Sequence, residues 1–193
     1  MACVTIPEKK WRIDGAGEIE AFLKPFGIWY ERWDVERGVG PNAPPDAILA
    51  AYAPEIEVLK KRGGYVTADV IDVTPELPGL DAMLNKFNKE HTHAEDEVRF
   101  IVKGSGIFHI HPQSGQVFGI QLEAGDMINV PAGTRHWFDL CATRTILAIR
   151  LFREASGWTP VYVDGGVHGQ FEPVCFGPQN INGGGVKLES GLK

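Results

Sequence analysis

Four side chains of the types that bind metal ions occur in two short stretches of this sequence. His91, His93 and Glu97 lie close together in the first stretch, and His136 lies in the second, which covers residues 130–138. Alternate side chains on an extended chain point to the same face, so the first three would converge on one side of a strand. Three imidazoles and one carboxylate suit a borderline divalent metal such as iron, nickel, copper or zinc. The alternative is a solvated polar strand followed by an unrelated histidine, and the first stretch by itself does not decide between the two.

The residues around these ligands form two turn-and-strand patterns. Glu97 is followed by a Gly-Ser-Gly turn that begins at Gly104, and His136 ends the pattern G-x5-P-x-G-x2-H. This pair resembles the two signature motifs of the cupin superfamily, whose members are small antiparallel barrels with a metal in the mouth. The resemblance implies a mainly β fold, a cupin barrel (double-stranded β-helix or jelly roll). It also strengthens the metal interpretation.

Other side chains near the four ligands have more than one interpretation. Arg99 lies two residues beyond Glu97 and shares its face of the strand, which favours a position in the pocket. Glu95 shares that face too, and it either assists proton transfer or is a solvated loop acid. Arg150, a lone charge in an apolar strand, is either a pocket residue or a rim arginine paired with a surface carboxylate. Phe87, just before the ligands, either packs in the core or forms a pocket wall.

A second H-x-H pair, His109 and His111, is the main competitor for the metal. No acid follows this pair at useful spacing, and a Pro-Gln-Ser-Gly turn comes directly after it. We therefore predict the end of a hairpin near water rather than a metal site. For His168 we predict a surface loop, and Asp69 is predicted to be solvated.

Composition excludes several classes of protein. The 193 residues are 44% apolar, which is enough for one core, so a single domain with appendages is expected. The net charge of −6 comes without a cluster of lysines and arginines, which argues against a nucleic-acid partner. No apolar run approaches the ~18 residues of a membrane span. The first ten residues lack the layout of a secretory signal, which favours the cytoplasm.

The cysteines also favour a reducing compartment. Cys3, Cys141 and Cys175 are odd in number, far apart and without C-x-x-C spacing. This pattern predicts no disulfide framework. Cys141 follows a strand-like run and is predicted to be a small core residue.

The organisation of the chain changes near residue 90. Before it, apolar residues at helical spacing predict helices over residues 15–25, 46–63 and 80–87, with a kink or a break at Pro54. After it, turn signals recur about every 8–12 residues, which predicts a β-sandwich or barrel. We expect one cupin domain over residues 1–172, with residues 1–85 as a helical and strand elaboration and 86–160 as the metal-binding barrel core. We expect residues 173–193 to form an irregular, Gly- and Asn-rich tail.

A closer resemblance emerges over residues 87–100, whose sequence is FNKEHTHAEDEVRF. This segment resembles the hallmark of the acireductone dioxygenases. Val-Pro-Ala and His-Trp-Phe-Asp in residues 130–139, Ala-Ile-Arg-Leu-Phe at 148–152 and Gly-Trp at 157–158 are similar to that family as well. The resemblance covers roughly residues 15–160 and ends before the tail.

Membership of this family would imply an enzyme of methionine salvage. Such enzymes cleave 1,2-dihydroxy-5-(methylthio)pent-1-en-3-one, an acireductone, with O2. The iron form gives 4-methylthio-2-oxobutanoate and formate, and the nickel form gives carbon monoxide, formate and 3-methylthiopropanoate. The implied ligands of one Fe(II) or Ni(II) per chain are His91, His93, Glu97 and His136. The implied roles of the other residues are catalysis by Arg99 and Glu95, and substrate binding by Phe87, Phe138, Arg150 and Trp158. Four ligands on an octahedral ion leave two adjacent positions, enough for a substrate that chelates through two oxygens.

Two other functions stay open at this point. A cupin isomerase acting on a sugar phosphate would need several cations for the phosphate, and only Arg99 and Arg150 lie near the motifs. A non-catalytic metal- or ligand-binding cupin would usually accompany a DNA-binding module, and the first ninety residues have no basic face. We expect a monomer whose partners are a small acireductone and O2, with no nucleic acid and no membrane.

Overall fold

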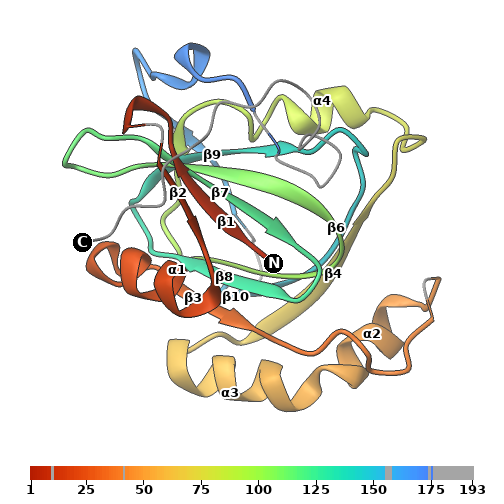
Figure 1. Cartoon of the computed structure of the whole chain (residues 1–193). Helices are drawn as coiled ribbons and strands as arrows, with labels where there is room; N and C mark the ends of the chain where they lie inside the picture. Colours follow the sequence, from red (N-terminus) through yellow and green to blue (C-terminus); the bar gives the residue numbers. More distant parts are fainter. Residues whose placement is uncertain (10, 41, 155–157, 174, 176–193) are drawn as a thin grey trace, which may run out of the picture.

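Antiparallel strands form the framework of the protein in the computed structural model, which describes residues 1–9, 11–40, 42–154, 158–173 and 175 (Figure 1). The strands are β1 (Cys3–Ile6), β2 (Trp11–Asp14), β3 (Trp29–Arg32), β4 (Thr67–Val73), β5 (His91–Thr92), β6 (Glu97–His111), β7 (Phe118–Glu123), β8 (Asp126–Val130), β9 (Arg135–Leu140), β10 (Ile146–Phe152) and β11 (Val161–Tyr162). Every pairing between them is antiparallel. The mainly β prediction is therefore confirmed. The predicted tail, residues 173–193, lies almost wholly outside the described residues.

The long strand β6 belongs to both layers of the barrel. Its first half pairs with β8 and β10, which in turn pair with β3 and β4. Its second half pairs with β7 and β9, and β7 continues through β1 to β2. The change occurs at Gly104, whose φ of +83° favours glycine and where a Cβ would collide with the carbonyl of Thr145. The predicted Gly-Ser-Gly turn is thus a bend inside one continuous strand.

Two apolar clusters hold these layers together. The first fills the barrel and includes Phe108, Ile110 and Ile128, all fully buried. The second lies between the outer face of the β6–β10 layer and the helices α2 (Pro45–Ala51) and α3 (Ala53–Gly63), which run along one side of the barrel in Figure 1. Alternation along β6 therefore sends Val98 and Phe100 toward the helices, and the residues between them into the barrel.

The helices agree with the predicted spans with small differences. The predicted break near Pro54 is confirmed, because α2 ends at Ala51 and Pro54 lies in the first turn of α3. Helix α1 (Ala16–Leu23) continues into a short 3-10 turn (Lys24–Phe26) at the predicted position, and α4 is shorter than predicted (Leu80–Leu84). Two further 3-10 turns cover Pro7–Lys9 and His168–Gln170. Among the described residues, no helix is both long enough and apolar enough to span a membrane.

Candidate metal centre

Three strands bring the four predicted ligands together inside the barrel. His91 on β5 lies directly opposite His136 on β9 in the antiparallel register. The chain bends after His93, and Glu97 begins β6, so the three residues of the first stretch do not share one strand as predicted. Their convergence is nevertheless confirmed. The four side chains are buried, and their ligand atoms lie within 4.8 Å of one another.

The hydrogen bonds of the three imidazoles fix which ring nitrogen faces the centre. The Nδ1 atoms of His91, His93 and His136 lie 2.6, 3.1 and 2.8 Å from backbone carbonyl oxygens, which belong to Lys89, Thr159 and Thr134 respectively. A carbonyl oxygen only accepts, so each Nδ1 carries the hydrogen and each Nε2 presents a lone pair.

This arrangement fits a bound cation. The Nε2 atoms of His93 and His136 lie 3.1 and 3.0 Å from the same oxygen, Oε2 of Glu97. Within the part of the chain that the structure describes, the buried Nε2 atoms of His91 and His93 have no hydrogen-bond partner. Lone pairs that face a carboxylate repel it unless a positive charge lies between them. Imidazole and carboxylate donors with this geometry suit a borderline divalent metal ion.

The protonation states at neutral pH also suit metal binding. Burial, followed by the nearby His136, lowers the pKa of His91 to about 4, so its ring is neutral. Burial alone would raise the pKa of Glu97, but the neighbouring guanidinium of Arg99 outweighs it and holds that pKa well below its usual range. The centre therefore offers a neutral imidazole at His91 and an ionised carboxylate, which is the state that binds metal.

Arg99 lies inside the barrel, next to the carboxylate ligand. Only 5% of its surface is exposed, and its Nε lies 2.7 Å from Oε1 of Glu97. Its guanidinium carbon lies 4.6 Å from the ring centroid of Phe138, 5.3 Å from that of Phe108 and 5.5 Å from that of Trp158. Sequence reasoning missed Phe108, which was not distinguishable from an ordinary core residue.

Arg150 is paired with a carboxylate across the sheet. It lies opposite Arg99 in the β6–β10 register, and it donates from Nε and Nη2 to the two carboxylate oxygens of Asp69, at 2.8 and 2.6 Å. Its guanidinium carbon is also 5.5 Å from the ring centroid of Trp158. The prediction that Asp69 is solvated is wrong, because its half-exposed carboxylate is hydrogen-bonded to Arg150. A bidentate partner compensates the charge of Arg150 and leaves the more buried Arg99 facing the ligands.

The other predicted pocket residues lie around the ligands, except for the side chain of Glu95. The ring of Phe87 is 6.1 Å from that of His91, and the ring of Trp158 is 6.2 Å from that of His93. The indole N–H of Trp158 donates to the carbonyl of Asp96 at 3.1 Å. The carboxylate of Glu95 accepts a solvent-exposed hydrogen bond from the backbone N–H of Arg153. Its proposed part in proton transfer stays a prediction.

The second H-x-H pair lies outside the metal-ligand group, as predicted, but its predicted surroundings are wrong. His109 is buried in β6, and its ring stacks on that of Trp137 at 4.8 Å, with Nε2 3.4 Å from Oδ2 of Asp139. His111 is partly buried, with Nδ1 2.6 Å from Oε1 of Glu90. His168 is also partly buried, its ring 6.5 Å from that of Trp137. His109 and His111 lie on the outer face of β6, and the chain after β10, which includes His168 and Phe171, packs on the same face against Trp137.

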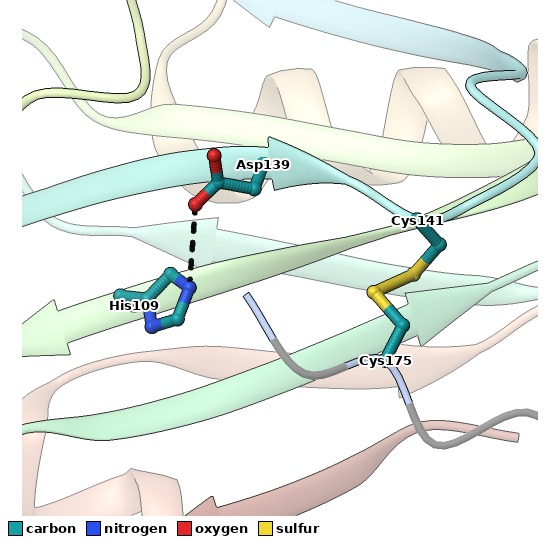
Figure 2. Close-up of a disulfide and its surroundings, with 4 residues drawn as sticks. All are labelled: His109, Asp139, Cys141 and Cys175. Atoms are coloured by element: carbon teal, nitrogen blue, oxygen red, sulfur yellow. Dashed lines mark ion pairs between the residues drawn. A yellow bond between two sulfur atoms is a disulfide. The ribbon is translucent and has the colours of Figure 1, made fainter. Parts of the chain in front are cut away.

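The prediction of no disulfide is wrong, because Cys141 and Cys175 form a disulfide bond. Their Cα atoms lie 5.6 Å apart, although 34 residues separate them in sequence. Figure 2 shows this bond at the end of β9, with the pair His109 and Asp139 nearby. Cys3 is buried and is the free cysteine of the described residues. The spacing of the cysteines did not reveal the pairing, because only the fold brings residue 175 back to β9.

Known proteins resemble this chain over most of its length. A sequence model described as the ARD/ARD' family matches residues 32–160. The acireductone dioxygenase of Picosynechococcus sp. is 40% identical over 169 residues, covering 88% of this chain and 96% of that protein. The acireductone dioxygenase of Stutzerimonas stutzeri is 44% identical over 154 residues, covering 80% and 84%. The solved structure of acireductone dioxygenase from Bacillus anthracis, with a cadmium ion in its active centre, superposes with a TM-score of 0.78. It is 38% identical and covers 84% of this chain and 98% of that one.

Proposed function

Since the chain belongs to the acireductone dioxygenase family, within the cupin superfamily, and is a metal-dependent dioxygenase, we propose that it cleaves 1,2-dihydroxy-5-(methylthio)pent-1-en-3-one with O2 in methionine salvage. The products of the iron form are 4-methylthio-2-oxobutanoate and formate. The observation that carries this proposal is the buried group His91, His93, Glu97 and His136 with Arg99 directly beside it. A sugar-phosphate isomerase would need several cations for the phosphate, and a non-catalytic sensor needs no buried arginine beside its metal ligands.

The metal of the proposal is one Fe(II) or Ni(II) per chain, held by those three histidines and Glu97. When bound, the ion supplies a Lewis acid and a template that fixes two oxygens of the substrate. The three backbone carbonyls that hold the Nδ1 hydrogens keep each imidazole turned toward that ion.

Arg99 provides the main electrostatic contribution of the protein itself. Its guanidinium is fixed by Glu97 and by three aromatic rings, so it does not have to reorganise as negative charge develops on the enediolate. The aromatic residues exclude water, which strengthens this interaction. Arg150 contributes less, because it is more exposed than Arg99 and two of its donors are bound to Asp69.

The walls of the pocket orient the rest of the substrate. Phe87, Phe138 and Trp158 lie around the ligands and Arg99, and their apolar rings suit a methylthio tail. The backbone N–H of Phe138 donates to the carbonyl of Phe87 at 2.8 Å, which ties two of these walls together. For Glu95 the proposal is assistance in proton transfer, on the ground of its place between the ligands in the sequence.

The experiment uses one polypeptide with two metals. The protein is stripped of metal, reloaded with iron or with nickel, and incubated with the acireductone and O2. We expect oxygen uptake by both forms and carbon monoxide in the headspace of the nickel form alone. Oxygen uptake by neither form would refute the proposed reaction. Uptake by both without carbon monoxide would mean that the pocket enforces one cleavage whatever metal it holds.

A monomer in the cytoplasm, with one cupin domain over residues 1–172, completes the proposal. The family supports a cytoplasmic location, whereas a Cys141–Cys175 bond is more usual in oxidising compartments. Alkylation of free thiols in intact cells, before lysis, distinguishes the two. Reduced Cys141 and Cys175 would support the cytoplasm, and a fully formed bond would contradict it.

A further inference from the structure

Residues 158–173 form a strap along β5, the strand that carries His91, and His93 follows directly after that strand. Strand β11 in this strap pairs with β5, with Val161 opposite Thr92 and Tyr162 opposite His91. Just before β11, the carbonyl of Thr159 accepts the Nδ1 hydrogen bond of His93. The family match ends at residue 160, so most of the strap lies beyond it. Thr159 itself lies inside the match, so the strap contacts one ligand at its first residues and then continues beyond the matched region.

Glu90 attaches this strap to the ligand strand. Its side chain is 1% exposed, its backbone carbonyl accepts from Val163 N at 3.0 Å, and its Oε2 accepts from Val167 N at 2.7 Å. Its other oxygen, Oε1, lies 2.6 Å from Nδ1 of His111 on β6. One buried carboxylate thus joins β6 and the strap to the residue that precedes His91.

The strap passes so close to Glu90 that a side chain at Gly166 would be crowded. A Cβ on Gly166 would lie 3.0 Å from Cβ and 3.1 Å from Oε2 of Glu90. A buried carboxylate is costly without partners, and its two charge-assisted hydrogen bonds satisfy it here. Among the described residues, no lysine or arginine pairs with Glu90. The carboxylate is therefore committed to His111 and Val167, and its loss would release both.

We propose that Glu90 is a positioning residue of the metal centre. It holds the strap in place so that the Thr159 carbonyl keeps the hydrogen of His93 on Nδ1, and Nε2 remains turned toward the metal. This inference rests on the metal centre of the proposed function, but not on the identity of the substrate. Outer hydrogen-bond partners of metal-binding histidines are typically worth ~10–100-fold in metal affinity.

The test compares the rate of Co(II) release from fully loaded variants to an excess of chelator. Glu90→Met keeps the length of the side chain but removes both acceptors, so release should accelerate by about 10–100-fold. Glu90→Gln keeps an acceptor and should restore a large part of the wild-type rate. Val167→Pro removes the donor on the strap without changing the barrel, and the φ of −88° at Val167 is close to that of proline. Val167→Pro should therefore also accelerate the release of Co(II).

The matched control is Asp139→Asn, which changes a carboxylate on the same outer face. This carboxylate contacts His109 and, among the described residues, makes no ion pair with the strap. The release rate of this variant should equal that of the wild type. A second measurement follows the ligand-ring N–H signals of the Co(II) protein by paramagnetic NMR. In Val167→Pro, the Nδ1 hydrogen of His93 should exchange with solvent faster, while that of His136, bonded to Thr134, should not.

The outcomes distinguish a failure of the metal centre from a failure of the role proposed for Glu90. Wild-type protein that binds no Co(II) would refute the metal centre itself. Wild-type protein that binds Co(II), with unchanged release from Glu90→Met and Val167→Pro, would overturn only the role of Glu90. Equal acceleration by Asp139→Asn would overturn it as well, because the effect would then belong to general loosening of the sheet. If Glu90→Met does not fold, Val167→Pro and the N–H exchange decide.

Discussion

Loss of the Cys141–Cys175 bond should cost this protein a large part of its stability. The bond joins residues 34 apart, so it closes a loop of that size in the unfolded chain. The chain-entropy relation for such a loop gives an entropy loss of about 13 cal/mol/K in the unfolded state, or ~4 kcal/mol at 25 °C. Cys175→Ser, or reduction of the wild type, removes this constraint. For a chain of 193 residues, this corresponds to a fall in Tm of about 8–16 °C.

Urea unfolding of the oxidised protein, the reduced protein and Cys175→Ser measures this effect. The reduced protein and the variant should agree with each other, and reductant should have no further effect on the variant. Cys3→Ser is the matched control, because Cys3 is free and its loss should leave the effect of reductant intact. A difference below ~1 kcal/mol between oxidised and reduced protein would refute the reasoning, because the unfolded-state constraint would then be cancelled by strain in the fold.

Three further results are expected. His93→Ala should empty the metal site, whereas His109→Ala should leave the metal content unchanged. Elemental analysis measures both, and metal loss in His109→Ala would contradict our choice between the two H-x-H pairs. Arg99→Ala should retain its metal but lose ~10–1000-fold in kcat, as for loss of one preorganised electrostatic donor; unchanged kinetics in the loaded variant would exclude that role. The metal-free protein should lose stability as the pH falls from ~6.5 to ~4. In that window the unfolded chain protonates His91 while the folded chain, with a pKa of about 4, does not. The pH dependence of urea unfolding should therefore be shallower in metal-free His91→Asn, and equal slopes would show that other groups cause it.

Local signals in the sequence predicted the helices, the β character and the ligands. Turn residues at short intervals and the proline near the start of α3 act on their immediate neighbours, so their effects need no knowledge of the fold. The ligand set was found because few patterns place two histidines, an acid and an arginine so close together. The argument from a single strand was nevertheless wrong, since a bend separates His93 from Glu97. Both residues still face the barrel, because β5 lies in the layer of β9 while the start of β6 lies in the facing layer, beside β8.

The environments of individual side chains were decided only by the tertiary structure. The turn after His111 predicted that His109 lies near water, yet His109 is buried, because the chain after β10 returns across the outer face of the sheet. Arg150 binds Asp69, and Glu90 binds Val167 as well as His111; Asp69 and Val167 each lie more than seventy residues from the side chain they bind. The same return brings Cys175 to Cys141. Residue type and spacing determine which side chains are able to bind a metal, because that depends on donor chemistry. Burial, hydrogen-bond partners and the disulfide depend on which distant segments the fold places in contact.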